Sequence, residues 1–176
     1  MEMALVKDYI ANYLKSKTPS LIPRELKLKV ITGKAITVIG PRRAGKTSLL
    51  LEELAKYDRN DTVYLDFEDI ALKSISAVDA LKCITEVFGE VSGRKAKNVF
   101  LDEIQNVNDW QSLVRTLLDR GYLVYVTGSS SKLLTREIAT QLRGRSVSYL
   151  LLPFSFSEAL TALGESDLNP LYSTPP

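Results

Sequence analysis

The sequence predicts an α/β fold, a three-layer sandwich in which a five-stranded, mainly parallel sheet lies between helices. Short apolar runs alternate with amphipathic stretches along the chain, which is typical of a parallel sheet covered by helices. The expected strands are residues 35–39, 62–65, 99–101, 123–126 and 146–152. A length of 176 residues with 45% hydrophobic and 25% charged residues is ordinary for one globular domain.

The segments between these runs carry apolar residues at helical spacing. Leu5, Tyr9 and Tyr13 share one face of an N-terminal helix, and residues 110–118 follow the i, i+3, i+4, i+7 spacing of a buried helix. Ser155 and Glu158 form a capping-box pattern at the start of a last helix. We therefore expect an N-terminal helix and lead-in over residues 1–33, a main domain over 34–164, and a loose tail or linker over 165–176.

Composition removes several classes of function. With 23 Lys and Arg against 21 Asp and Glu, the net charge of +2 does not resemble that of a dedicated nucleic-acid binder. The chain has no histidine, and its one cysteine is Cys83, which argues against an internal disulfide, a Cys/His zinc site and Ser-His catalysis. No apolar run reaches the roughly 18 residues of a membrane span. We expect a cytoplasmic protein whose chemistry uses carboxylates, Lys, Arg, hydroxyls, amides and hard metals.

A phosphate-binding loop follows the first expected strand. Residues 40–47 read GPRRAGKT and match the pattern G-x-x-x-x-G-K-[ST] between a strand and a helix. Gly40 and Gly45 let the backbone turn so that its amides face phosphate oxygens. Lys46 is expected to bridge the β- and γ-phosphates, and the Thr47 hydroxyl to ligate Mg²⁺. The predicted nucleotide-binding residues are Gly40, Pro41, Arg42, Arg43, Ala44, Gly45, Lys46, Thr47 and Ser48.

A second motif ends the third expected strand in two carboxylates. Residues 98–103 read NVFLDE, so Asp102 can reach the shell of a Mg²⁺ ion through water, and Glu103 can act as general base on the attacking water. The additional strand at 62–65, between the two motifs in sequence, favours P-loop ATPases of this kind. The absence of N-K-x-D and D-x-x-G motifs argues against a GTPase, and Glu103 argues against a small-molecule kinase.

Further polar groups are expected around these carboxylates. We expect the strand at 123–126 to lie between the two motif strands, so that Thr127 or Ser129 contacts the γ-phosphate or the attacking water. Arg145 is the favoured arginine finger, acting within its own chain or from a neighbouring subunit, and Arg143 is the alternative. Asp66, at the end of the second strand, is a candidate for restraining Glu103.

Taken together, these motifs resemble a known family. The segments GPRRAGKTSLL, YLDFED, VFLDEIQNVNDW, VTGSSSKLL, LRGR and LPFSFSEAL are similar to those of archaeal and bacterial AAA-like P-loop ATPases of the MNS/STAND branch, within the ASCE division. The resemblance implies ATP at residues 40–47, a Mg²⁺ and water site at Asp102 and Glu103, a sensor strand at 127–129, and the family's G-R arginine at Arg145. Members of that family usually continue into a helical lid and a C-terminal region, so this chain is expected to be the ATPase core without that region.

Two functions fit this pattern. The leading expectation is Mg²⁺-dependent ATP binding and hydrolysis that drives a conformational switch. The alternative is a nucleotide-gated binding module with negligible turnover of its own. ATP is the expected small-molecule partner, a homo-oligomer that supplies an arginine in trans is left open, and any nucleic-acid contact is assigned to the missing C-terminal region, with no membrane contact expected.

Overall fold

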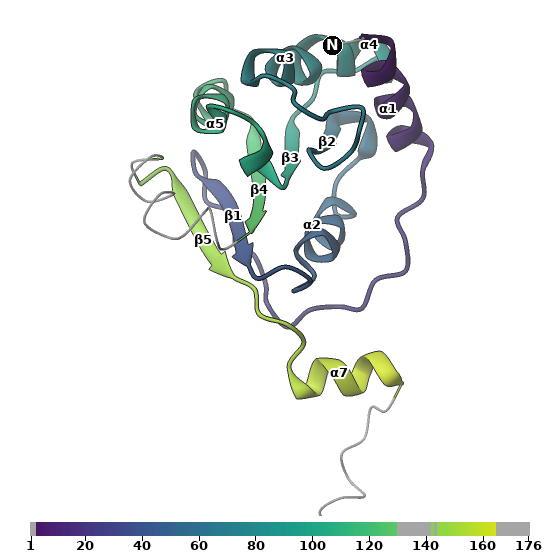
Figure 1. Ribbon diagram of the computed structural model, residues 1–176, viewed down its shortest axis with the longest axis vertical. Helices are drawn as coiled ribbons and strands as arrows, with labels where there is room; N and C mark the ends of the chain where they lie inside the picture. The colour runs from purple at the N-terminus through teal and green to yellow at the C-terminus, as the bar shows by residue number, and fades with distance from the viewer. Residues whose placement is uncertain (1–2, 130–141, 143, 165–176) are drawn as a thin grey trace, which may run out of the picture.

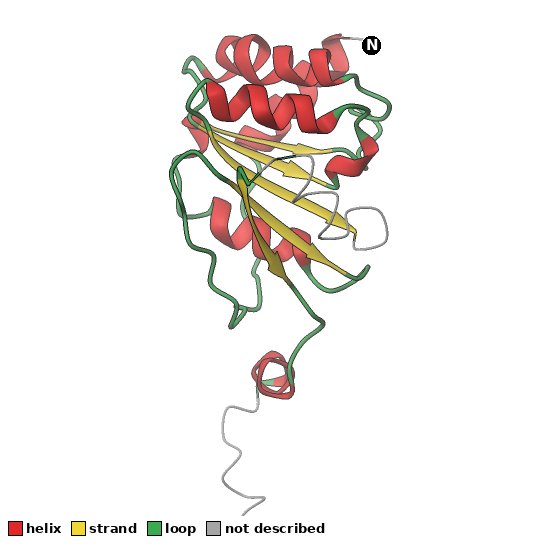
Figure 2. Cartoon of the chain, turned by 90° about the vertical axis from the view of Figure 1, so that its left-hand side faces the viewer, coloured by secondary structure: helices red, strands yellow, loops and turns green. Residues whose placement is uncertain are grey.

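A parallel sheet with helices on both faces forms the centre of the molecule (Figures 1 and 2). The computed structural model describes residues 3–129, 142 and 144–164. The strands are β1 (Ala35–Gly40), β2 (Thr62–Asp66), β3 (Asn98–Asp102), β4 (Leu123–Ser129) and β5 (Ser146–Leu150). They pair in parallel in the order β2-β3-β4-β1-β5, which confirms the predicted α/β sandwich.

The helices fill the connections between strands. They are α1 (Met3–Lys15), α2 (Lys46–Leu54), α3 (Ala77–Lys82), α4 (Phe88–Ser92), α5 (Trp110–Asp119) and α7 (Phe156–Leu163). A π-helical turn at Cys83–Val87 joins α3 to α4, and 3₁₀ turns lie at Arg59–Asp61 and Ile104–Asn106. Helix α2 covers one face of the sheet and α3, α4 and α5 the other, while α7 lies apart from these layers (Figures 1 and 2). Among the residues described, no helix has the length and apolar character to cross a membrane.

The strand order brings the two sequence motifs to one edge. Strand β4 lies between β1 and β3, as predicted, with Val38 opposite Thr127 and Gly40 opposite Ser129. In a parallel sheet all carboxyl ends meet at the same edge, so the phosphate loop after β1, the acidic pair after β3 and the polar end of β4 converge there. Strand β5 ends at Leu150, earlier than residue 152, and the chain leaves toward α7 after Leu151 donates a last hydrogen bond to the Ile39 carbonyl, at 2.8 Å.

Helix α1 covers the outer edge of β2. The Tyr9 hydroxyl accepts a hydrogen bond from the Asp66 amide at 2.9 Å, and the Tyr13 hydroxyl donates to the Thr62 carbonyl at 2.9 Å. The two tyrosines are one helical turn apart and thus contact the two ends of the same strand. Burial raises the pKa of Tyr13 to about 12, which keeps its hydroxyl a donor. Backbone groups of the edge strand that would otherwise pair with another chain are thereby satisfied.

The core contains the apolar side chains that the helical spacing predicts over residues 110–118, whereas Leu5, expected on the same helix face as Tyr9 and Tyr13, is 50% exposed. Trp110 and Cys83 are both buried, and burial raises the pKa of the Cys83 thiol to about 11. The aromatic rings of Phe100 and Tyr125 stack with their centroids 4.4 Å apart. Cys83 is therefore a packing residue, because a thiol with a raised pKa is a poor nucleophile at neutral pH.

Removing the Tyr13 hydroxyl tests the role of α1. We expect Tyr13→Phe to lower the free energy of unfolding by about 1–2 kcal/mol, since the buried Thr62 carbonyl then loses its donor. Chemical denaturation measures the change. Tyr122→Phe is the matched control, because the Tyr122 hydroxyl has no hydrogen-bond partner among the described residues and is expected to change stability by less than about 0.5 kcal/mol. Equal effects of the two substitutions would contradict this role.

Candidate functional site

The loop between β1 and α2 makes the tight turn that its two glycines predict. A Cβ on Gly40 would lie 2.1 Å from the Leu151 carbonyl oxygen, so only glycine fits beside the end of β5. Gly45 has φ 87°, in the left-handed region that favours glycine, and it immediately precedes α2. Arg43 adopts φ 64° in the same loop. The loop therefore ends at a helix N-terminus, where backbone amides and the helix dipole favour an anion.

Lys46 and Glu103 meet at this loop. Both line a cavity of about 650 Å³, whose other lining residues are Arg42, Arg43, Gly45, Thr47 and Glu68. The Lys46 side chain is 4% exposed, and its Nζ lies 3.4 Å from Glu103 Oε1 and 3.3 Å from the Pro41 carbonyl oxygen. The carboxylate therefore balances the buried ammonium group, at the position where the motif predicts contact with phosphate oxygens.

Thr127 connects the two acidic residues. Its hydroxyl donates to Asp102 Oδ1 and accepts a hydrogen bond from the Glu103 amide at 2.9 Å. Asp102 and Thr127 are fully or almost fully buried, whereas the Glu103 side chain is 15% exposed. Glu103 adopts φ 50° and ψ 48°, a left-handed conformation that is uncommon outside glycine and turns its side chain out of the strand direction. The structure thus brings together Lys46, Asp102, Glu103 and Thr127, four of the residues predicted for the site.

Two more side chains hold these carboxylates. The Tyr64 hydroxyl donates to Asp102 Oδ2 at 2.9 Å, and burial together with the neighbouring carboxylate raises the pKa of Tyr64, which keeps it a donor. Gln105 Nε2 donates to Glu103 Oε2 at 2.6 Å. The Asp66 carboxylate accepts from the Glu68 amide at 2.9 Å and makes no hydrogen bond to Glu103 within the described chain. Gln105 therefore has the contact with Glu103 that the sequence suggested for Asp66.

Arg24, in the lead-in before β1, is a site residue that the motifs missed. Its guanidinium is 4% exposed and donates to the carbonyl of Ala44 in the phosphate loop at 2.7 Å. It also pairs with Glu158 of α7, with Nε 2.8 Å from Oε1. Glu158 was expected as a capping-box residue, and it does cap α7. No motif joins Arg24 to Glu158, since 134 positions separate them in the chain.

The remaining predicted residues have other locations. The Arg145 carbonyl accepts from the Ala35 amide at the amino end of β1, and its side chain pairs with Asp119 at 2.5 Å. The phosphate loop follows the carboxyl end of β1, whereas Arg145 lies beside the amino ends of the strands. Arg145 therefore does not act on the phosphate loop of its own chain. Action from a neighbouring subunit stays a prediction. Ser129 is the last residue of β4. The Ser129 side chain and Arg143 are not among the parts of the chain that the structure describes.

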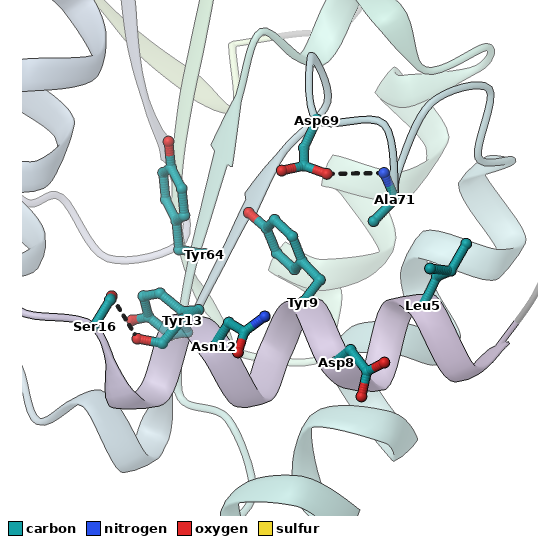
Figure 3. A pocket seen from close by; sticks show the side chains of 9 residues that line it. All are labelled: Leu5, Asp8, Tyr9, Asn12, Tyr13, Ser16, Tyr64, Asp69 and Ala71. Atoms are coloured by element: carbon teal, nitrogen blue, oxygen red, sulfur yellow. Dashed lines mark hydrogen bonds between the residues drawn. The ribbon is translucent and has the colours of Figure 1, made fainter.

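Two further cavities lie near the phosphate loop and near α1. One of about 460 Å³ shares Arg43 and Gly45 with the 650 Å³ cavity and is otherwise lined by the lead-in, Ala44, Ser48 and the chain after β5. The other, of about 450 Å³, lies along α1, where Tyr9, Tyr13 and Tyr64 line it (Figure 3). The first lies beside the cavity at Lys46 and Glu103, while the second has no lining residue in common with it.

The oxygen groups available here suit a hard cation that keeps several bound waters better than a cation coordinated entirely by protein side chains. The described residues contain no group of three or more His, Cys, Asp or Glu side chains that could hold a metal ion. Thr47 lines the phosphate cavity, and the buried Asp102 lies at the adjoining strand end. Mg²⁺ characteristically binds one or two protein oxygens, several waters and substrate phosphates, which matches this sparse set.

Comparison with known proteins identifies relatives of this chain. The family described as "AAA domain" matches residues 32–160. An uncharacterized protein of Methanocaldococcus jannaschii is 41% identical over 145 residues, which cover 82% of this chain and 32% of that protein. An uncharacterized protein of Haemophilus influenzae is 34% identical over 133 residues, which cover 71% of this chain and 32% of that protein. The chain thus spans about a third of the length of these relatives.

Among solved structures, AMPPCP-bound DnaA from Aquifex aeolicus is similar in outline. The match has a TM-score of 0.43 and 14% sequence identity, and it covers 96% of this chain and 51% of that one.

The Glu158 carboxyl predicts a dependence of stability on pH. Hydrogen bonds from Arg24 and from the amides of Glu25 and Ser155 lower the pKa of Glu158 from an ordinary value of 4.5 to about 2. A lowered pKa in the folded state gives stability that is present above pH 4.5 and is lost as the pH falls toward 2. We therefore expect the difference in unfolding free energy between wild type and Glu158→Gln to narrow between pH 6 and pH 3, as measured by chemical denaturation.

Glu52, which accepts from the Arg24 amide at 3.3 Å, is the same in both proteins, so the comparison isolates Glu158. A constant difference between the two proteins from pH 6 to pH 3 would show that Glu158 does not titrate with a lowered pKa.

Proposed function

Because the chain belongs to the AAA domain family, whose members are nucleotide-binding ATPase domains, we propose that it binds ATP with Mg²⁺ and hydrolyses it. One observation carries the proposal: the buried Lys46 ammonium, the Glu103 carboxylate and the Thr127–Asp102 hydrogen bond form one connected set beside the phosphate loop. This set contains the cation, the base and the metal-side carboxylate that phosphoryl transfer to water requires.

The two adjoining cavities support a nucleoside triphosphate as substrate. The triphosphate would lie in the 650 Å³ cavity against the amides of residues 40–47, and the base and sugar in the 460 Å³ cavity. Leu21, Ile22 and Phe154 give that second cavity apolar walls suited to a heterocyclic base. Arg43 and Gly45 line both cavities, so the two adjoin at the phosphate loop, as one ligand with a phosphate end and a base end would require. The preference for adenine follows from the missing guanine motif and from the family.

Residues of this chain can hold the metal ion and the attacking water. The Thr47 hydroxyl and, through water, the Asp102 carboxylate would bind Mg²⁺, which supplies charge neutralisation at the phosphates. Glu103 would accept the proton of the water that attacks the γ-phosphorus. Gln105 and Thr127 keep Glu103 in position for that role, since they hold its carboxylate and its amide respectively.

Lys46 connects binding to catalysis in this mechanism. Its ammonium group is 3.4 Å from Glu103 Oε1, so phosphate oxygens would compete with the Glu103 carboxylate for the same cation. Transfer of Lys46 to the phosphates would free Glu103 Oε1 to accept a proton. Binding of substrate therefore completes the general base, which prevents Glu103 from acting before the triphosphate is present.

The wider setting is also part of the proposal. The motif set supports placement in the MNS/STAND branch, a cytoplasmic location, and hydrolysis that drives a conformational switch in a longer protein. The division into a lead-in at 1–33, an ATPase domain at 34–164 and a linker at 165–176 belongs to the same proposal, although residues 165–176 lie outside those described. Arg145 would act as an arginine finger only toward the phosphate loop of a neighbouring subunit.

A binding module with negligible turnover is the second candidate. The position of Arg145 at the amino ends of the strands favours it, because among the described residues Arg24 is the arginine outside the phosphate loop that bonds to the loop. An isolated chain would then hold ATP without stabilising the charge that develops in the transition state.

Steady-state hydrolysis of Mg-ATP tests both candidates. We expect Lys46→Ala to abolish hydrolysis and to weaken nucleotide binding, and Glu103→Gln to lower kcat by about 10²-fold or more, as expected for loss of a general base. Thr116→Ala, in α5 and away from the loop, is the control that keeps wild-type rates.

The assay is repeated over a hundredfold range of protein concentration. Specific activity that rises with concentration supports a residue contributed in trans. Tight ATP binding with no hydrolysis at any concentration supports the binding module. Hydrolysis by Glu103→Gln at the wild-type rate would contradict the assignment of Glu103 as the base.

A further inference from the structure

We infer that Arg24 and Glu158 form a latch that couples occupancy of the phosphate loop to the docking of helix α7. The inference rests on the proposed function, since it assumes that the loop binds a nucleotide. It assigns Arg24 as a positioning residue of the loop and Glu158 as the residue that connects α7 to it.

Arg24 joins three segments that are distant in sequence. Its Nη1 donates to the Ala44 carbonyl at 2.7 Å, and its Nη2 donates at 2.7 Å to the carbonyl of Leu152, which follows β5. The guanidinium also binds the Glu158 carboxylate through Nε at 2.8 Å and Nη2 at 3.2 Å. Its carbon lies 4.8 Å from the centroid of the Phe154 ring. One buried cation therefore fixes the phosphate loop, the exit from β5 and α7 to one another.

The Ala44 carbonyl is a sensitive point of attachment. Ala44 lies between Arg43 at φ 64° and Gly45 at φ 87°, both in the left-handed region. The alternation of backbone conformation at these residues sets the direction of the amides that would face phosphate oxygens. A hydrogen bond to the carbonyl between them fixes this arrangement, and a Cβ on Gly45 would lie 3.1 Å from Arg24 Nη1. Loss of Arg24 would therefore loosen the loop itself.

Helix α7 depends on Glu158 for its attachment. Within α7, Glu158 is buried, whereas Phe156 is 68% and Leu163 75% exposed. Figure 1 shows α7 beyond the edge of the layered core. The Glu158 carboxylate also accepts from the Glu25 amide at 2.8 Å and from the Ser155 amide at 2.8 Å. Ala159 and Leu160 are half-buried, so the buried attachment of this helix to the domain is the polar cluster centred on Arg24.

Coupling between the two ends of the latch is reciprocal. If the bound nucleotide favours the loop conformation that Arg24 stabilises, then docking of α7 and binding of nucleotide each strengthen the other by the same factor. Nucleotide binding at the loop thereby changes the stability with which α7, the last described helix of the chain, is docked. Such a connection would let hydrolysis change the attachment of α7 without a direct contact between α7 and the nucleotide.

The test compares Glu158→Gln with Glu25→Gln, a matched control in which an exposed neighbouring carboxylate is neutralised. Two quantities are measured for each protein: the Kd of a non-hydrolysable ATP analogue with Mg²⁺, and amide hydrogen exchange in α7 with and without that analogue. We expect Glu158→Gln to raise the Kd at least about fivefold, in the range of typical allosteric couplings, and to abolish the protection of α7 by nucleotide. Glu25→Gln is expected to match wild type in both.

A double variant guards against a folding defect, because a buried cation left without its partner is destabilising. Arg24→Met combined with Glu158→Leu replaces the pair by apolar side chains, a change that is often neutral for stability, and is expected to show the same loss of coupling. If a folded double variant bound the ATP analogue with wild-type affinity and its α7 were protected from hydrogen exchange as in wild type, the latch would be overturned. The proposed function would remain intact. Failure of wild type to bind the analogue would overturn the proposed function, and the coupling with it.

Discussion

The hydroxyl group of Thr127 is the point on which the geometry of the site depends. It donates to Asp102 and accepts from the Glu103 amide, so one buried side chain sets both the orientation of the Asp102 carboxylate and the left-handed turn that directs Glu103 toward Lys46. Only a strand between β1 and β3 can present a side chain at this position, and β4 is that strand. The arrangement of these four side chains is therefore a consequence of strand order.

Two buried cations near the phosphate loop have contrasting partners. Lys46 pairs with the carboxylate of Glu103, the proposed general base, whereas Arg24 pairs with Glu158, which has no role in the proposed chemistry. A buried charge needs a partner, because leaving it unpaired costs several kcal/mol, on the order of 3–5. For Lys46 the phosphates of a nucleotide can replace Glu103, so that pair is exchangeable. The Arg24 pair has no such substitute and is permanent while α7 is docked.

Much of the site follows from local sequence, and the rest does not. The phosphate loop, the acidic pair and the capping box at Ser155 each lie within eight consecutive residues, so their spacing is sufficient to predict them. The contacts of Arg24 and Tyr64 join residues 134 and 38 positions apart, and no local pattern marks them. Arg145 is the arginine of a recognisable G-R motif. That motif precedes β5 and therefore lies at the amino ends of the strands. Whether a residue precedes or follows its strand thus predicts its distance from the site better than its position in a recognised sequence motif does.

The affinity of Glu103→Gln for nucleotide tests the central claim, that phosphate oxygens replace Glu103 as the partner of Lys46. Calorimetry with a non-hydrolysable ATP analogue and Mg²⁺ would compare this variant with wild type and with Glu68→Gln, which removes a carboxylate from the same cavity without touching Lys46. The account predicts tighter binding by Glu103→Gln than by either, by about tenfold or roughly 1.4 kcal/mol relative to wild type. Affinity equal to that of Glu68→Gln, or weaker than wild type, would contradict it.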